Sequence, residues 1–182
     1  MRGGREIPGD RDAEASLLRE LESLYAEVDA AFAATSCPGT TECCRFGRTG
    51  REPYVTSLEA ALVMRAVRRR GNTLPARPGP LHETHRELPV VRDERACPLL
   101  DPEGRCSIYG QRPFGCRTFY CERATSLSPV RHKAVVDFVR RLKDLAARHE
   151  PRGDEGRPLT RALETSKSGA RTAGPSVGRR RR

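Results

Sequence analysis

Apolar residues recur at helical spacing in three separate segments of this 182-residue chain. In the first segment, residues 13–34, they follow a period close to 3.6 residues, at Leu17, Leu21, Leu24, Val28 and Phe32. Asp10 or Asp12 can cap this segment at its start, and Ser36 stands near its expected end. Charged side chains occupy the opposite face, so the pattern predicts an amphipathic helix that packs into the core.

The second helical segment begins at a capping box, in which Glu59 follows Thr56 by three residues. Its apolar positions continue as far as Val67, and Gly71 is the expected terminator. The three consecutive arginines at residues 68–70 suit the negative end of the helix dipole. We prefer that interpretation to a nucleic-acid contact.

The third helical segment begins after Ser128 and Pro129, a pair that is typical of a helix start. It should end by His149, because Pro151 follows. Its apolar stripe consists of Val135, Phe138, Val139, Leu142, Leu145 and Ala146.

Residues 72–95 are rich in proline and have no hydrophobic period, so they predict a surface loop with a strand at residues 88–91. The loop carries His82 and His85, whose H-x-x-H spacing is compatible with metal binding. Histidines in loops are more commonly solvent-exposed, and we favour that interpretation here.

These elements predict a small α-rich α+β fold, in which three amphipathic helices surround an irregular, metal-stapled cysteine region with one short hairpin. We expect one cysteine-cluster domain over residues 1–150 and a disordered basic tail over residues 151–182. The hydrophobic fraction is only 36% and tryptophan is absent. Such a core needs an additional staple, and a metal ion can provide one.

The net charge of +10 is concentrated at the end of the chain, because residues 151–182 carry nine basic and three acidic residues. This basic tail, which ends at Arg179–Arg182, predicts either weak, salt-dependent contact with nucleic acid or a role in solubility alone. Residues 1–16 are charged, and no run of about 18 apolar residues is present. We therefore expect no signal peptide, no membrane contact and a cytoplasmic location.

All seven cysteines fall in two short segments, residues 37–44 and residues 97–121. In a reducing compartment, clustered thiols are more typical of metal ligands than of disulfides, and an odd number disfavours a closed disulfide framework. We predict that folding brings the two segments together around a metal centre. The candidate ligands are Cys37, Cys43, Cys44, Cys97, Cys106, Cys116 and Cys121.

The second segment contains a turn signal, because residues 101–104 place Asp, Pro and Gly where a type I turn prefers them. A hairpin built on this turn carries Cys97 on one arm and Cys106 on the other. Chain reversal near residues 112–113 would bring Cys116 back to the same site.

Cys43 and Cys44 are adjacent, so in an extended chain their side chains point to opposite faces. We do not expect them to bind one ion together unless a turn intervenes. Four arginines lie close to cysteines in the sequence: Arg45, Arg105, Arg112 and Arg117. Their charges can offset that of metal-bound thiolates, or lower the pKa of the thiols where no metal is bound.

The first segment, CPGTTECC, resembles the CxxCxxCC signature of the YkgJ-like cysteine-cluster proteins, a family of zinc- or iron-chelating domains. Thr40 stands where that signature has its second cysteine. The second segment resembles the family pattern C-P-x-L-D-x-x-G-x-C-x-I-Y-x-x-R-P-x-x-C-R-x-x-x-C with all four cysteines present. The resemblance covers residues 37–121 and implies a small metal-binding protein. A similar cysteine region is associated with flagellin lysine N-methylases.

The first functional hypothesis is a metal-binding protein that holds an iron–sulfur cluster or zinc. The chain has no C-x-x-C knuckle of the kind that zinc modules usually present, which favours iron–sulfur slightly. An alternative is a metal-dependent or redox enzyme, or a partner of an enzyme that modifies proteins. A further alternative is a metal-stapled module that contacts nucleic acid through its tail. The sequence lacks a phosphate loop, a nucleophile elbow and an H-E-x-x-H motif, so it assigns no catalytic residue. It also assigns no protein partner.

Overall fold

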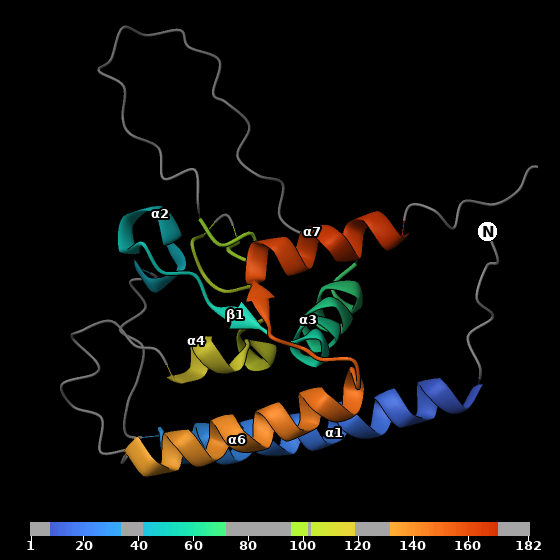
Figure 1. Cartoon of the computed structure of the whole chain (residues 1–182). Helices are drawn as coiled ribbons and strands as arrows, with labels where there is room; N and C mark the ends of the chain where they lie inside the picture. Colours follow the sequence, from blue (N-terminus) through green and yellow to red (C-terminus); the bar gives the residue numbers. More distant parts are fainter. Residues whose placement is uncertain (1–7, 34–41, 72–95, 102, 119–131, 171–182) are drawn as a thin grey trace, which may run out of the picture.

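The computed structural model describes residues 8–33, 42–71, 96–101, 103–118 and 132–170. Within these ranges the chain is mostly helical, with one two-stranded antiparallel sheet (Figure 1). The helices are α1 (Pro8–Ala31), α2 (Phe46–Thr49), α3 (Ser57–Arg69), α4 (Phe114–Thr118), α6 (His132–His149) and α7 (Leu159–Ala170). The strands are β1 (Tyr54–Val55) and β2 (Arg157–Pro158), and single 3-10 turns lie at Glu42–Cys44 and Tyr109–Gln111.

The three amphipathic helices predicted from the sequence are all present, as α1, α3 and α6. The capping box of α3 is complete: the Thr56 side chain accepts from the Glu59 amide, and the Glu59 carboxylate accepts from the Thr56 amide. Gly71, the predicted terminator, has a left-handed φ of 89°. The strand predicted at residues 88–91 lies outside the described residues.

α1 and α6 lie side by side along one edge of the molecule (Figure 1). Glu20 of α1 pairs with Arg148 at 2.6 Å, and Glu27 pairs with Arg141 at 2.6 Å. From Glu20 to Glu27 the chain advances along α1, while the paired arginine moves back along α6. The two helices are therefore antiparallel. No helix among the described residues has the length and apolar character needed to cross a membrane.

The first of two hydrophobic cores lies where α1 and α6 meet α3 and α4. Its apolar side chains come mainly from the predicted stripe of α1, together with Leu58 and Leu62 of α3, Phe114 of α4 and Leu142 and Leu145 of α6. Val135, Phe138 and Val139 of α6 pack against it from the side. The sequence stripes of the long helices therefore meet one another, as their periodicity predicts.

α3 also faces a second core on its other side. This core contains Phe46, Val55, Ala60, Val63, Met64, Ala66, Val67, Leu99, Ile108, Leu159, Ala162 and Leu163. The side chains of Cys97 and Cys106 pack against it. Because α3 lies between the two cores, the position of the cysteine region depends on this helix.

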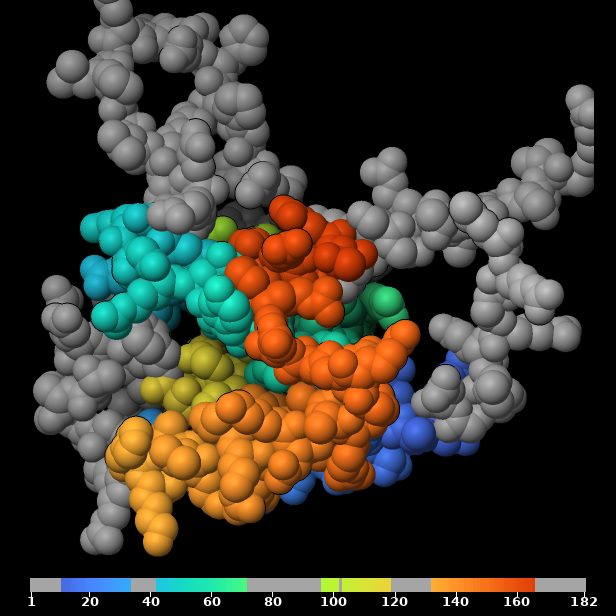
Figure 2. Space-filling view, in the orientation of Figure 1, coloured from blue at the N-terminus to red at the C-terminus, as the bar shows by residue number. Residues whose placement is uncertain are grey.

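Residues 151–170 do not belong to a disordered tail, contrary to the sequence-based prediction. β2 pairs with β1, and α7 buries Leu159, Ala162 and Leu163 in the second core. Figure 2 shows α7 and α2 at one end of the molecule, with α6 along the other. These three buried positions are too few to stand out as a period in a polar stretch. Residues 171–182, with the arginine run, lie outside the described residues.

Candidate metal centre

The described part of the first cysteine segment forms a single 3-10 turn, Glu42–Cys44. The Arg45 amide donates a 3.0 Å hydrogen bond to the Glu42 carbonyl oxygen. This turn brings the sulfur atoms of Cys43 and Cys44 to 4.0 Å from each other. Two thiolates bonded at about 2.3 Å to one tetrahedral ion lie about 3.8 Å apart. In an extended chain these adjacent side chains would face opposite sides, whereas this turn allows both to bind one ion.

The hairpin predicted in the second segment is confirmed around Asp101. Its carbonyl oxygen accepts from the Gly104 amide at 2.9 Å, and its carboxylate accepts from the Arg105 amide at 2.6 Å. Gly104 has a φ of 76°, a conformation that favours glycine. Beyond the turn, Leu100 and Cys106 form an antiparallel bridge. The two arms of the hairpin are therefore paired up to Cys106.

The backbone joins the two cysteine segments directly. The Cys97 amide donates a 2.7 Å hydrogen bond to the Cys44 carbonyl oxygen. The neighbouring residues Arg45 and Ala96 form an antiparallel bridge. Segments that lie about fifty residues apart in the sequence thus run beside each other at their cysteines, as the sequence analysis predicts.

Cys116 reaches this region from the short helix α4. Its amide donates a 2.9 Å hydrogen bond to the carbonyl oxygen of Pro113, just before the helix begins. The preceding residue, Gly115, lies so close to the chain before β1 that an added Cβ would meet the Cβ of Pro53 at 3.3 Å. A glycine at this position therefore lets α4 approach the chain that leads into α3.

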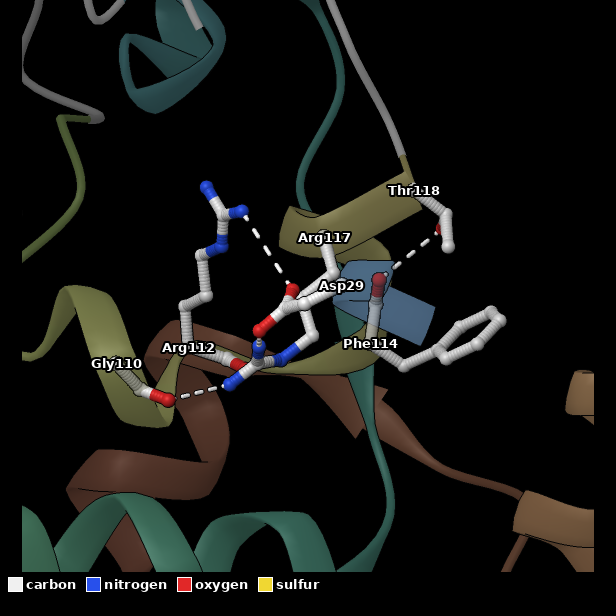
Figure 3. A network of polar contacts seen from close by, with 6 residues as sticks. All are labelled: Asp29, Gly110, Arg112, Phe114, Arg117 and Thr118. Atoms are coloured by element: carbon white, nitrogen blue, oxygen red, sulfur yellow. Dashed lines mark hydrogen bonds and ion pairs between the residues drawn. The ribbon is translucent and has the colours of Figure 1, made fainter. Parts of the chain in front are cut away.

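Arg117 fixes the corner between the Tyr109–Gln111 turn and α4 from the inside (Figure 3). The Arg117 residue is only 2% exposed. Its Nε donates to the Arg112 carbonyl oxygen at 2.9 Å, and its terminal nitrogens contact the Gly110 carbonyl oxygen and Asp29 of α1. The guanidinium also stacks over the Tyr25 ring, 4.2 Å from its centroid. Its contacts thus connect the corner to α1, a role that sequence proximity to Cys116 did not indicate.

Glu59 is a second buried polar residue that positions the same corner. Its carboxylate accepts hydrogen bonds from the Tyr25 hydroxyl at 2.8 Å and from the Phe114 amide at 2.8 Å, in addition to its capping contact. Burial raises the pKa of Tyr25, and the negative charge of Glu59 raises it further. The capping-box motif predicted only the role of Glu59 at the start of α3. Its contact with Phe114 of α4 has no signal in the sequence.

The environment of the three partly buried thiols in the second segment favours their neutral form. Burial raises the pKa of Cys97 to about 12, and the nearby Cys106 and Cys43 raise it as well. Burial also raises the pKa of Cys106 and of Cys116, again with a contribution from Cys43. Thiols from both segments are therefore within electrostatic reach of one another.

Cys43 is the exception, because its thiolate is stabilised. Hydrogen bonding from the Cys44 thiol, together with the positive charge of Arg112, lowers the pKa of Cys43 to about 6. The same interaction raises the pKa of Cys44, which keeps the shared proton. The lowered pKa favours the thiolate form of Cys43, and thiolate is the form that binds metal.

Arg112 carries a positive charge that acts on two of the thiols. Its side chain is 13% exposed, and its guanidinium stacks over the ring of Tyr109 at 4.1 Å. One terminal nitrogen lies 3.9 Å from the carboxylate of Asp29. Its Nε is buried and has no hydrogen-bond partner among the described residues. Its charge lowers the pKa of Cys43 and opposes the rise in that of Cys106.

Five of the seven predicted ligands lie in the described residues, and their thiols are free: Cys43, Cys44, Cys97, Cys106 and Cys116. Cys37, Cys121, His82 and His85 lie outside the described residues. Among the described residues, no three His, Cys, Asp or Glu side chains are close enough to hold a single ion together. The donor chemistry nevertheless fits zinc or iron, because the Cys97–Cys44 backbone contact brings thiols of both segments together and thiolates are ligands of either metal.

The comparisons with known proteins point to the same segment of the chain. Residues 36–134 match the model of the CxxCxxCC family, whose description is "Putative zinc- or iron-chelating domain". The match spans more than half of the 182 residues. No curated protein and no solved structure matches the chain.

Proposed function

The chain belongs to the CxxCxxCC family of zinc- or iron-chelating domains, and we propose that it binds an iron–sulfur cluster through thiolates from both cysteine segments. The ligands are drawn from Cys37, Cys43, Cys44, Cys97, Cys106, Cys116 and Cys121. The proposal goes beyond family membership in two respects: it names the type of centre, and it requires both segments.

The observation that carries the proposal is the 2.7 Å hydrogen bond between the Cys97 amide and the Cys44 carbonyl oxygen. It aligns the two segments at their cysteines, so that thiols from each segment share one region. The partly buried side chains of Cys97 and Cys106 also pack against the second core. Partly buried thiols from two segments, together with the lowered pKa of Cys43, suit a metal–thiolate centre.

The number and spread of the thiols support a cluster rather than a single ion. Cys97, Cys106 and Cys116 each lie within electrostatic reach of Cys43. A cluster with several irons accepts thiolates that are spread around it, because each iron takes its own ligand. Seven cysteines also exceed the four that one zinc ion needs.

Zinc is the second candidate, and one distance favours it. The 4.0 Å separation between the sulfur atoms of Cys43 and Cys44 fits two ligands on one tetrahedral ion. Zinc bound in this way would act as a structural staple, since binding a structural metal stabilises the folded chain directly. The hydrophobic fraction of 36% is consistent with such a need.

Anaerobic purification of the full chain, followed by visible absorption and analysis of iron, sulfide and zinc, distinguishes the two candidates. A coloured protein with iron and acid-labile sulfide is the result that we expect. A colourless protein with stoichiometric zinc would replace the cluster by the second candidate. A protein that contains neither metal, and takes up neither iron with sulfide nor zinc when reconstituted, would overturn both.

A further inference from the structure

Cys44 and Cys97 lie opposite each other in the backbone pairing that joins the two cysteine segments. Arg45 and Ala96 form an antiparallel bridge. The next pair in the same register, one residue back on one side and one residue forward on the other, is Cys44 with Cys97. The 2.7 Å hydrogen bond from the Cys97 amide to the Cys44 carbonyl oxygen agrees with that register. Two cysteines from distant parts of the chain therefore share one cross-strand position.

The spacing at this position suits a disulfide. Residues at a hydrogen-bonded position of an antiparallel pair have Cα atoms about 5.5 Å apart, and their side chains lie on the same face. Disulfides usually join residues whose Cα atoms are about 4.4–6.8 Å apart. Both residues are partly exposed and their thiols are free, so a small oxidant can reach them.

The backbone disfavours two competing pairings. The sulfur atoms of Cys43 and Cys44 are 4.0 Å apart, but a trans peptide fixes adjacent Cα atoms about 3.8 Å apart, closer than disulfides usually allow. Cys106 belongs to a different register, because its bridge partner is Leu100. Within the described part of the chain, Cys97 is thus the cysteine that the backbone pairing sets opposite Cys44.

We propose that Cys44 and Cys97 are an oxidation site of the metal-free chain, where hydrogen peroxide joins them in a disulfide that locks the two cysteine segments together. The two thiols give up two protons and two electrons as the S–S bond forms. The O–O bond of the peroxide breaks and yields two water molecules, and a reducing thiol reverses the step by exchange. Formation of the disulfide does not depend on the proposed function.

One consequence does rest on the proposed function. Cys44 and Cys97 are both candidate ligands, and a sulfur atom in a disulfide is no longer the thiolate that binds metal. Oxidation of the metal-free chain therefore removes one ligand from each segment and blocks the shared centre until the disulfide is reduced.

Tryptic mapping of the full-length protein identifies the pairing, because Cys97 is the only cysteine of peptide 96–105, whereas Cys44 lies in peptide 20–45. The reduced protein is freed of metal with a chelator, oxidised with dilute hydrogen peroxide, alkylated and digested without reductant. We expect the loss of two of the seven titratable thiols, and a reducible cross-link between these two peptides.

Two matched variants identify the cysteine of the first segment. Cys44→Ser should lose the cross-link, whereas Cys43→Ser, which changes the neighbouring thiol of the same turn, should keep it. A cross-link that survives in Cys44→Ser would overturn the inference. So would wild-type protein that forms no disulfide, joins Cys97 to another peptide, or forms its disulfide within peptide 20–45. The wild-type map decides these outcomes even when a variant does not fold.

Metal uptake tests the consequence separately. The oxidised protein should take up less zinc, or less iron with sulfide, than the reduced protein, and dithiothreitol should restore uptake. Full uptake by cross-linked protein would contradict the block and leave the disulfide established. A reduced chain that binds neither metal would overturn the proposed function, while the peptide map still decides the oxidation site.

Discussion

The backbone amide of Cys97 donates a 2.7 Å hydrogen bond to the carbonyl oxygen of Cys44. This contact, together with the Arg45–Ala96 bridge, sets the register between two cysteine segments that are far apart in the sequence. Backbone groups make this register, so the two segments are aligned at Cys44 and Cys97 by the fold of the chain.

Replacing Glu59 by glutamine should destabilise the protein by about 1–3 kcal/mol. Both carboxylate oxygens of Glu59 accept hydrogen bonds, from the Tyr25 hydroxyl, the Phe114 amide and the capped end of α3. Glutamine presents an NH₂ group to one set of these donors, and a buried donor is left without an acceptor. Chemical denaturation measures the loss, with Glu14→Gln on the exposed face of α1 as the control. Equal stability of the two variants would argue against a central role for Glu59.

The raised pKa of Tyr25 predicts a loss of stability at alkaline pH. Its folded-state pKa is raised by burial and by Glu59, whereas in the unfolded chain it is about 10. A raised pKa means that the stabilising contribution is complete below about pH 10 and is lost as the pH rises above that value. Unfolding free energies at pH 8 and pH 11 should therefore differ more in the wild type than in Tyr25→Phe. An identical pH dependence in both proteins would contradict this account.

Replacing Leu163 by alanine should lower stability by about 2–5 kcal/mol, the range for a buried leucine. Leu163 is 1% exposed and lies in the second core, against which Cys97 and Cys106 also pack. We expect metal affinity to fall together with stability. Arg161→Ala on the exposed side of α7 is the matched control, and thermal unfolding with chelator competition checks both effects. Wild-type stability in Leu163→Ala would show that α7 does not support the core.

Arg117→Met should destabilise the protein by about 3 kcal/mol, since a buried guanidinium with several polar contacts is lost. Its contacts reach Asp29, Gly110 and Arg112, so the corner that carries Cys116 should loosen as well. Hydrogen exchange of the α4 amides reports this directly. Faster exchange in α4 than in α6 is the expected pattern, and uniform exchange across both helices would contradict a local role for Arg117.

Periodicity predicted α1, α3 and α6, because each helix buries a stripe long enough to repeat several times. It could not predict α7, because the three buried apolar residues of this helix are too few to form a period. They become a core-facing stripe only where α3 and β1 pack against them. The cysteine spacing and the Asp101–Gly104 turn signal predicted the hairpin and the convergence of the two segments. The 4.0 Å separation of the Cys43 and Cys44 sulfur atoms depends on a 3-10 turn. The backbone at the end of this turn pairs with residues 96–97, a contact that local sequence does not indicate. The tertiary roles of Glu59 and Arg117 likewise left no trace in spacing or composition.

The central claim is that both cysteine segments hold one metal centre. Its most direct test is the metal content of the full-length variant in which Cys37, Cys43 and Cys44 are all replaced by serine, purified anaerobically beside the wild type. Every cysteine of the second segment is retained in this variant. We predict that it loses its metal while α1, α3 and α6 stay folded, as judged by circular dichroism. Metal bound at the wild-type stoichiometry and affinity would contradict a shared centre.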